Sequence, residues 1–118
     1  MKIILGEKMS TIDANLLEGK FKLKDIVEYQ DNTIVSRAFL KKPTGNLTAF
    51  AFDAGQELSE HTAPFDAYVI ILDGDAEIRI GGNPFELTEG ESIIMPANVP
   101  HALKAISKFK MLLIMIKS

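Results

Sequence analysis

Residues 75–88 read DAEIRIGGNPFELT, and this stretch decides the fold class. In its first half, apolar residues alternate with charged ones, which is the pattern of a β-strand with one face buried and the other in water. The pair Gly81-Gly82 follows, and two consecutive glycines suit the two-residue turn that joins antiparallel strands. Phe85 and Leu87 then resume the alternation. We therefore expect a β-hairpin over residues 75–88.

Turn residues also divide the rest of the chain into short apolar segments. These segments are about five to eight residues long and rich in Val, Ile, Phe and Ala, which predicts an antiparallel all-β sandwich or barrel. The turns that separate them contain Gly, Pro or Asn and lie at 43–46, 54–55, 73–74, 81–84, 88–90 and 96–100.

The segments that precede the hairpin differ in how clearly they indicate a structure. Residues 33–41 and 47–53 are rich in apolar residues, and we expect a strand over each. Residues 22–29 alternate poorly, yet they carry enough apolar side chains for a strand as well. Helix has little support, and we expect at most a short one over 11–18, which Gly19 would end.

Three expected strands are apolar on both faces, at 69–72, 93–95 and 111–116. A strand that faces solvent alternates, so a strand that is apolar on both sides needs cover on both sides. The barrel interior can cover one face. The other face needs a second sheet, the N-terminal segment or another subunit, because monomers rarely expose a large apolar patch. We therefore expect a homodimer.

The composition excludes several classes of protein. With 118 residues, the chain fits one domain over 1–118. It has no cysteine, which excludes disulfides, thiolate zinc sites and a cysteine nucleophile and fits a reducing compartment. There are 13 Lys and Arg against 16 Asp and Glu, for a net charge of -3, and Arg37 and Arg79 are the only arginines. This acidic balance argues against binding to nucleic acid.

The apolar runs are too short for a membrane protein. The longest run, residues 111–116, falls far short of the roughly 20 residues that cross a bilayer as a helix. The apolar residues 3–5 meet Gly6 too soon to form the core of a signal peptide. We therefore expect a cytoplasmic protein that binds neither membrane nor nucleic acid.

His61 and His101 are the only histidines, and each belongs to a set of spaced residues. A histidine on an apolar strand is most often a hydrogen-bonded core or rim residue, and that interpretation stands beside a functional one. The two sets read Gly55-x5-His61-x12-Gly74 and Gly90-x5-Pro96-x4-His101.

These spacings resemble the two motifs of the small stand-alone cupins, the type-2 conserved barrels. The first family motif is Gly-x5-His-x-His-x3,4-Glu-x6-Gly, and the second is Gly-x5-Pro-x-Gly-x2-His-x3-Asn. The resemblance covers residues 55–74 and 90–105. It implies an all-β, cupin-type jelly-roll β-barrel of two antiparallel sheets, with at most a short N-terminal helix.

The sequence departs from the family at the metal ligands. In the family, three histidines and a glutamate hold a divalent metal inside the barrel. Ala63 and Ala67 replace the second histidine and the glutamate, so His61 and His101 are the two ligands that remain. Asp66 is the nearest candidate for a third ligand, although it lies one residue out of phase on the strand. Further candidates stand just before His61, at Gln56, Glu57 and Glu60.

Two functions stay open at this point. The first is a small-molecule-binding barrel whose pocket His61 and His101 mark, with or without a divalent zinc, iron, manganese or nickel ion. The second is an enzyme in which the same two histidines are catalytic, through a bound metal or through acid–base chemistry, acting as a dioxygenase, isomerase or lyase on a small oxygen-bearing metabolite. Five side chains are candidates to line the pocket, or else belong to the core: Phe50, Phe52, Tyr68, Met95 and Met111.

Overall fold

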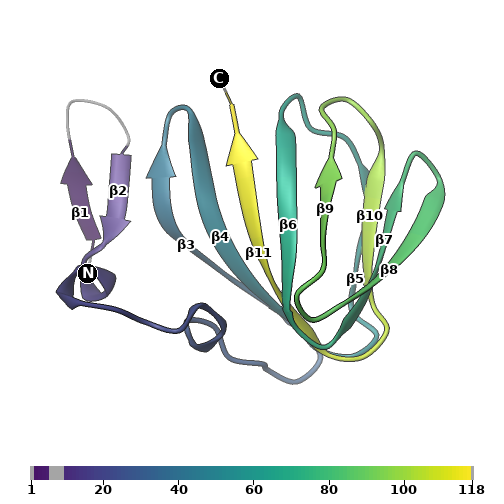
Figure 1. Cartoon of the computed structure of the whole chain (residues 1–118), viewed down its shortest axis with the longest axis horizontal. Helices are drawn as coiled ribbons and strands as arrows, with labels where there is room; N and C mark the ends of the chain where they lie inside the picture. Colours follow the sequence, from purple (N-terminus) through teal and green to yellow (C-terminus); the bar gives the residue numbers. More distant parts are fainter. Residues whose placement is uncertain (1, 6–9, 118) are drawn as a thin grey trace.

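This computed structural model describes residues 2–5 and 10–117. The strands in this part of the chain form two antiparallel sheets (Figure 1). The larger sheet has the order β1-β2-β3-β4-β11-β6-β9. Its strands are β1 (Lys2–Leu5), β2 (Ser10–Asp13), β3 (Ile34–Lys42), β4 (Gly45–Phe52), β11 (Phe109–Ile116), β6 (Asp66–Asp73) and β9 (Ser92–Met95). The smaller sheet has the order β5-β10-β7-β8, and its strands are β5 (Glu57–His61), β10 (His101–Ala105), β7 (Asp75–Ile80) and β8 (Asn83–Thr88).

This architecture confirms the expected fold class. The hairpin of residues 75–88 is present as β7 and β8, and Gly81 and Gly82 have φ values of +57° and +83°. Positive φ at both turn positions is what a two-residue hairpin requires. Two short 3-10 helices, η1 (Ala14–Glu18) and η2 (Leu23–Asp25), precede β3. Within the described residues no helix is long and apolar enough to cross a membrane.

The first hydrophobic core fills the space between the two sheets. Both sheets contribute buried side chains to it, and the rings of Phe52 and Phe109 stack there with centroids 4.4 Å apart. Val69, Ile71 and Met111 are among its largest fully buried side chains. The interior of the barrel is therefore packed with side chains.

A second core lies on the outer face of the larger sheet. Ile26 and Val27, which follow η2, are buried against this face over Ala49, Ala51 and Leu112. The small alanine side chains leave room for the segment to approach the sheet closely. The N-terminal segment thus supplies part of the cover that the two-sided apolar strands need.

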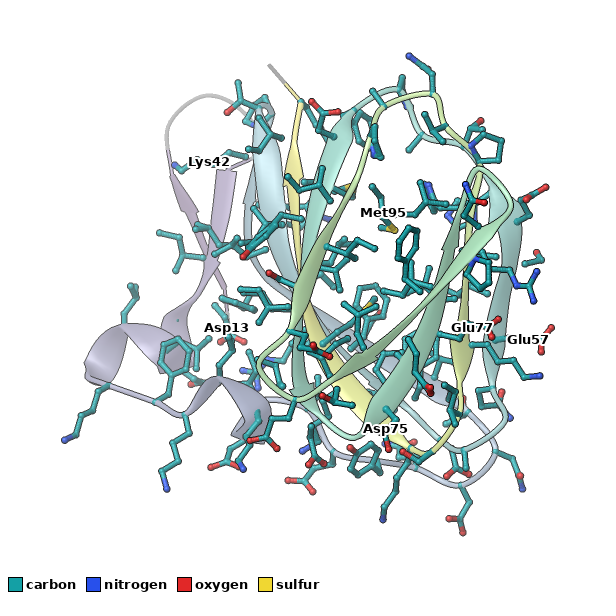
Figure 2. The ribbon with its side chains drawn as sticks, turned by 45° about the vertical axis from the view of Figure 1, so that its right-hand side comes forward. Asp13, Lys42, Glu57, Asp75, Glu77 and Met95 are labelled. Atoms are coloured by element: carbon teal, nitrogen blue, oxygen red, sulfur yellow. The ribbon has the colours of Figure 1, made fainter. Side chains whose placement is uncertain are left out.

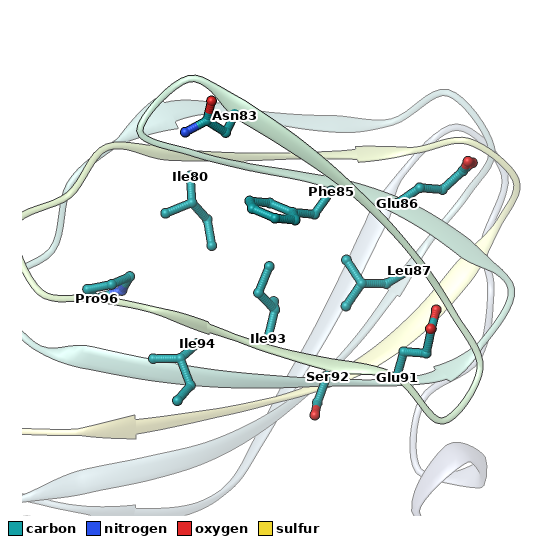
Figure 3. A pocket seen from close by; sticks show the side chains of 10 residues that line it. All are labelled: Ile80, Asn83, Phe85, Glu86, Leu87, Glu91, Ser92, Ile93, Ile94 and Pro96. Atoms are coloured by element: carbon teal, nitrogen blue, oxygen red, sulfur yellow. The ribbon is translucent and has the colours of Figure 1, made fainter.

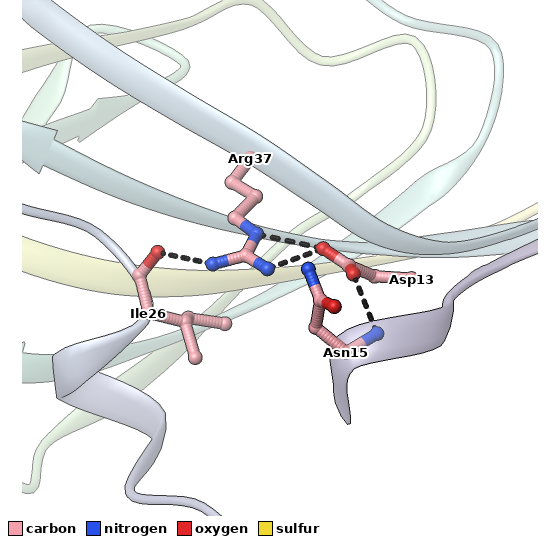
Figure 4. A network of polar contacts seen from close by, with 4 residues as sticks. All are labelled: Asp13, Asn15, Ile26 and Arg37. Atoms are coloured by element: carbon pink, nitrogen blue, oxygen red, sulfur yellow. Dashed lines mark hydrogen bonds and ion pairs between the residues drawn. The ribbon is translucent and has the colours of Figure 1, made fainter. Parts of the chain in front are cut away.

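Polar contacts hold this N-terminal segment in place. Arg37 on β3 donates hydrogen bonds to the Asp13 carboxylate and, at 3.1 Å, to the carbonyl oxygen of Ile26 (Figure 4). Lys110 Nζ donates to the carbonyl oxygen of Lys24 at 2.7 Å. These bonds satisfy backbone groups that have no partner in a sheet.

One expectation for the N-terminal region was wrong. Residues 22–29 are not a strand: after η2, they cross the face of the larger sheet instead of pairing with its edge. Their apolar side chains are buried by this crossing, so apolar content misled the strand prediction. The short helix expected within 11–18 is present as η1, which ends before Gly19, while the residues up to Asp13 belong to β2.

Candidate functional site

His61 and His101 lie side by side at one end of the smaller sheet. His61 is the last residue of β5 and His101 the first residue of β10, and the two are direct cross-strand partners. The register then shifts, because Leu103 pairs with Leu58, three residues before His61. An extra residue of this kind is a β-bulge, which re-aims the side chain that follows it. The bulge allows His61 to face the same side of the sheet as Leu58.

Each of the two imidazole rings directs its Nε2 atom toward the other ring. Their Nε2 atoms are 3.1 Å apart, and the ring planes are 74° apart. The Nδ1 atom of His61 lies 2.8 Å from the carbonyl oxygen of Ser59, and that of His101 lies 3.2 Å from the carbonyl oxygen of Val99. A carbonyl oxygen only accepts hydrogen bonds, so each Nδ1 carries the ring proton.

This arrangement turns the pair into a double acceptor. When both rings are neutral, each Nε2 presents a lone pair, and two lone pairs at 3.1 Å have no proton between them. A proton, a metal ion or a donor group of a ligand supplies what is missing. Burial lowers the pKa of His101 below the usual value for histidine, and His61 beside it lowers that pKa further, whereas the Val99 carbonyl raises it. His101 is therefore a neutral acceptor at neutral pH.

The donor set fits a family-type metal site only in part. Two nitrogens that bind one zinc ion at about 2.0–2.1 Å lie roughly 2.9–3.4 Å apart in neighbouring octahedral or tetrahedral positions, and the histidine pair satisfies this. Ala67 is buried in the barrel core and offers only a methyl group. Asp66 is exposed, and its Oδ1 accepts a hydrogen bond from the Ala97 backbone N–H at 2.8 Å.

Among the side chains that the structure describes, no carboxylate completes the pair, since no three His, Cys, Asp or Glu side chains gather there in a way that could hold a metal. Sites for a catalytic zinc ion use about three protein ligands. The residues present therefore match two ligand positions and do not fit the complete four-ligand site.

The other candidate residues lie apart from the histidines or within the core. Phe52, Met95 and Met111 are buried between the sheets, and Phe50 packs against them. Tyr68 is on the outer face of the larger sheet, where its hydroxyl donates to Ser92 Oγ at 2.9 Å. Figure 2 shows Met95 inside the barrel and Glu57 on its outside. Glu57 and Glu60 line a shallow depression on the smaller sheet. A ligand role for these residues stays a prediction.

The sequence did not indicate a pocket that the structure contains. A space of about 520 Å³ lies between β8 and β9, the edge strands of the two sheets (Figure 3). Its apolar lining consists of Ile80, Phe85, Leu87, Ile93, Ile94 and Pro96. The pocket begins one strand away from the histidines, because Ile80 is the cross-strand partner of His101. The sequence contained only one hint of this pocket: β8 and β9 each carry an apolar residue that is not part of the barrel core.

Comparisons with known proteins agree with this geometry. The sequence profile of the cupin domain matches residues 49–117. A conserved protein of unknown function from Streptococcus pyogenes is 38% identical, with a TM-score of 0.82 over 86% of this chain and 89% of that one. A cupin 2 conserved barrel domain protein from Leptotrichia buccalis is 44% identical, with a TM-score of 0.80 over 82% of this chain and 47% of that one.

A third solved structure adds a more distant likeness. A cupin superfamily protein from Desulfitobacterium hafniense is 27% identical, with a TM-score of 0.81 over 86% of this chain and 93% of that one. A comparison with curated proteins found no match.

Proposed function

This chain belongs to the cupin family, and we propose that it is a small-molecule-binding cupin whose ligand is held by the pair His61 and His101. One observation carries the proposal: the two Nε2 atoms lie 3.1 Å apart, while each Nδ1 atom lies within hydrogen-bond distance of a backbone carbonyl oxygen. Each ring is held in place through its Nδ1 atom, so the acceptors are already oriented before a ligand arrives.

The chemistry of the pair defines the group that it binds. Two neutral imidazole nitrogens accept from a hydroxyl or another donor, so the proposed ligand is a small molecule that carries such a group. The packing of the interior supports a ligand position beside Ile80, because Phe52, Phe109 and Met111 fill the barrel and the pocket begins at Ile80.

The small number of histidines makes a direct test practical. A long-range ¹H–¹⁵N spectrum of the imidazole rings contains signals from His61 and His101 alone. We expect that a hydroxylated metabolite that raises the melting temperature also shifts the Nε2 signals of both rings. His61→Ala should remove the stabilisation, whereas Thr62→Ala, an exposed neighbour, should keep it. Stabilising compounds that leave both rings unshifted would contradict the proposal.

A metal-dependent enzyme is the second candidate function, and the 3.1 Å spacing favours it. A bound zinc, iron, manganese or nickel ion would act as a Lewis acid, with His61 and His101 as its protein ligands. Protein that is purified without a histidine tag should then contain close to one metal ion per chain, and His61→Ala should release it. Turnover that survives a chelator and is lost in His101→Ala would instead favour acid–base catalysis.

We further propose a homodimer that forms through the outer face of the larger sheet. The registers place five apolar side chains in one row across this sheet: Leu40, Leu47, Ile114, Tyr68 and Ile94. The second core, where the N-terminal segment lies over Ala49 and Ala51, borders the row at Leu40, Leu47 and Ile114, and it leaves Tyr68 and Ile94 exposed. A second copy of the chain would bury this row.

A further inference from the structure

The pocket between β8 and β9 is a wedge with one closed end. The two strands are consecutive in the chain, and hydrogen bonds between Thr88 and Glu91 close the turn that joins them. From this turn the strands separate toward Asn83 and Pro96, and the pocket lies between them (Figure 3). The wedge opens at the end of the smaller sheet where His101 and Ile80 pair.

The lining of this β8–β9 cleft is mostly apolar and partly open to solvent. Ile80, Leu87 and Ile93 belong to or pack against the barrel core. Phe85 lines the wall formed by β8, and 47% of its surface is exposed. An apolar occupant that covers this ring removes that surface from water, which stabilises the complex.

The backbone of the cleft is not suited to an added strand. An extended peptide binds a sheet edge through a row of backbone N–H and C=O groups. Pro84 lies within β8 and Pro96 directly follows β9, and proline has no N–H to donate. The edge of β8 is therefore interrupted and that of β9 ends after four residues, which favours a small molecule over a peptide.

The charge of the lining selects among small molecules. Of the 10 residues that line the cleft, none is Lys or Arg, and two are glutamates. Glu91 accepts hydrogen bonds from Thr88, whereas the Glu86 side chain points away from the cleft, on the face of the hairpin that carries Glu77. An anionic ligand in the cleft would meet the Glu91 carboxylate without a compensating cation, which disfavours its binding.

We infer that the β8–β9 cleft binds the body of the ligand and selects uncharged, apolar ring compounds whose hydroxyl group reaches the pair His61 and His101. The inference rests on the proposed function, because the histidines bind the donor group and the cleft binds the ring. It excludes carboxylates, sulfonates and phosphate esters of similar size. Phe85 is the specificity-determining side chain, and Glu91 repels anions at the closed end of the cleft.

Three naphthalene compounds test the inference with one ring system. 2-Naphthol is neutral and donates a hydrogen bond, 2-methoxynaphthalene is neutral and does not donate, and 2-naphthalenesulfonate is an anion. The protein has no tryptophan, so the fluorescence of each compound reports its binding directly. We expect 2-naphthol to bind at least about tenfold more tightly than the sulfonate.

Two pairs of variants assign this preference to the cleft. Phe85→Ala should weaken the binding of 2-naphthol at least about tenfold, because it removes a ring that the ligand covers. Phe21→Ala is the matched control, since Phe21 is 46% exposed and lies on the N-terminal segment. Glu91→Gln should strengthen binding of the sulfonate, because it removes the charge and keeps an oxygen that accepts from Thr88. Glu28→Gln, at an exposed glutamate on that same segment, should not.

The outcomes separate the two proposals. Equal affinity for 2-naphthol and the sulfonate, or no effect of Phe85→Ala, would overturn the inference about the cleft. If 2-naphthol and 2-methoxynaphthalene bind equally, if Phe85→Ala weakens both, and if His61→Ala weakens neither, the cleft is confirmed as the site for the ring. That same result would overturn the role of the histidine pair in the proposed function.

Discussion

Gly74 and Lys108 lie in such close contact that a β-carbon at position 74 would be 1.9 Å from the carbonyl oxygen of Lys108. Gly74 also has a φ of +76°, which disfavours any residue with a side chain. It ends the first of the two spaced motifs and connects β6 to β7, which belong to different sheets. The glycine of the motif is therefore required by close packing of the backbone where the chain changes sheets.

Gly74→Ala should destabilise the protein by about 3 kcal/mol or more, because the backbone must move to relieve the contact as well as adopt an unfavourable φ. Gly90→Ala is the control, since Gly90 has a φ of +88° but nothing within 4 Å of its added β-carbon. That variant should lose only about 1 kcal/mol. Urea denaturation measures both values, and equal losses would show that the contact with Lys108 has no effect.

Stability should fall as the pH drops through the range in which histidine titrates. The pKa of His101 is lowered in the folded protein, so between that pKa and the ordinary value of 6.5 the unfolded chain binds more protons. The free energy of unfolding contains a contribution from His101 that is fully present above pH 6.5 and is lost as the pH falls.

Urea denaturation at several pH values from 8 to about 5 checks this expectation. The depressed carboxyl pKa values of Asp13 and Asp53 act at lower pH, so they affect this range little. His101→Gln should flatten the profile in this range. A variant profile as steep as that of the wild type would assign the pH dependence to other groups.

Ile94→Asp should convert the proposed dimer into a monomer. Ile94 is 59% exposed and ends the apolar row on the larger sheet, so a charge there would be buried in the interface. Sedimentation should give twice the chain mass of 13.0 kDa for the wild type and the single mass for the variant. Ile106→Asp, at an exposed isoleucine outside this row, should remain dimeric. A wild type that stays at 13.0 kDa would refute the dimer.

Tyr29→Phe should weaken the attachment of the N-terminal segment. The Tyr29 hydroxyl donates to Asp73 Oδ2 at 2.6 Å, and its loss leaves a half-buried carboxylate without this donor. We expect a loss of about 1–2 kcal/mol in the free energy of unfolding. Tyr68→Phe removes the hydrogen bond that a more exposed hydroxyl donates to Ser92, and it should lower the free energy of unfolding by about 0.5 kcal/mol or less. Equal losses in the two variants would contradict this role of Tyr29.

Local patterns explain why much of the fold could be predicted. The alternation in residues 75–80 and the glycine pair that follows describe a hairpin without reference to the rest of the chain. Gly55, Gly74 and Gly90 all have positive φ, so the spacing of the motifs reflects turns that only glycine forms easily. The strand predicted over 22–29 failed because its burial depends on a sheet built from residues far along the chain.

The candidate site could be predicted only as a list of residues. The spacing of the motifs indicated His61 and His101, but the bulge before His61 determines that the two rings face each other. The pocket beside them depends on β8 and β9 being the free edges of two different sheets. Which strands form the edges depends on the order of the strands in each sheet. The hydrophobic periodicity of the sequence does not reveal that order.

The sequence by itself determined the all-β class, the hairpin, the turns and the two histidines, because each depends on short-range alternation or on the conformational freedom of glycine. Only the tertiary structure decided that the N-terminal segment covers one sheet face, that two Nε2 atoms meet at 3.1 Å and that a cleft opens beside them. Those features arise from contacts between residues distant in the chain, such as the 40 positions between the histidines. Their geometry is set by strand register and packing.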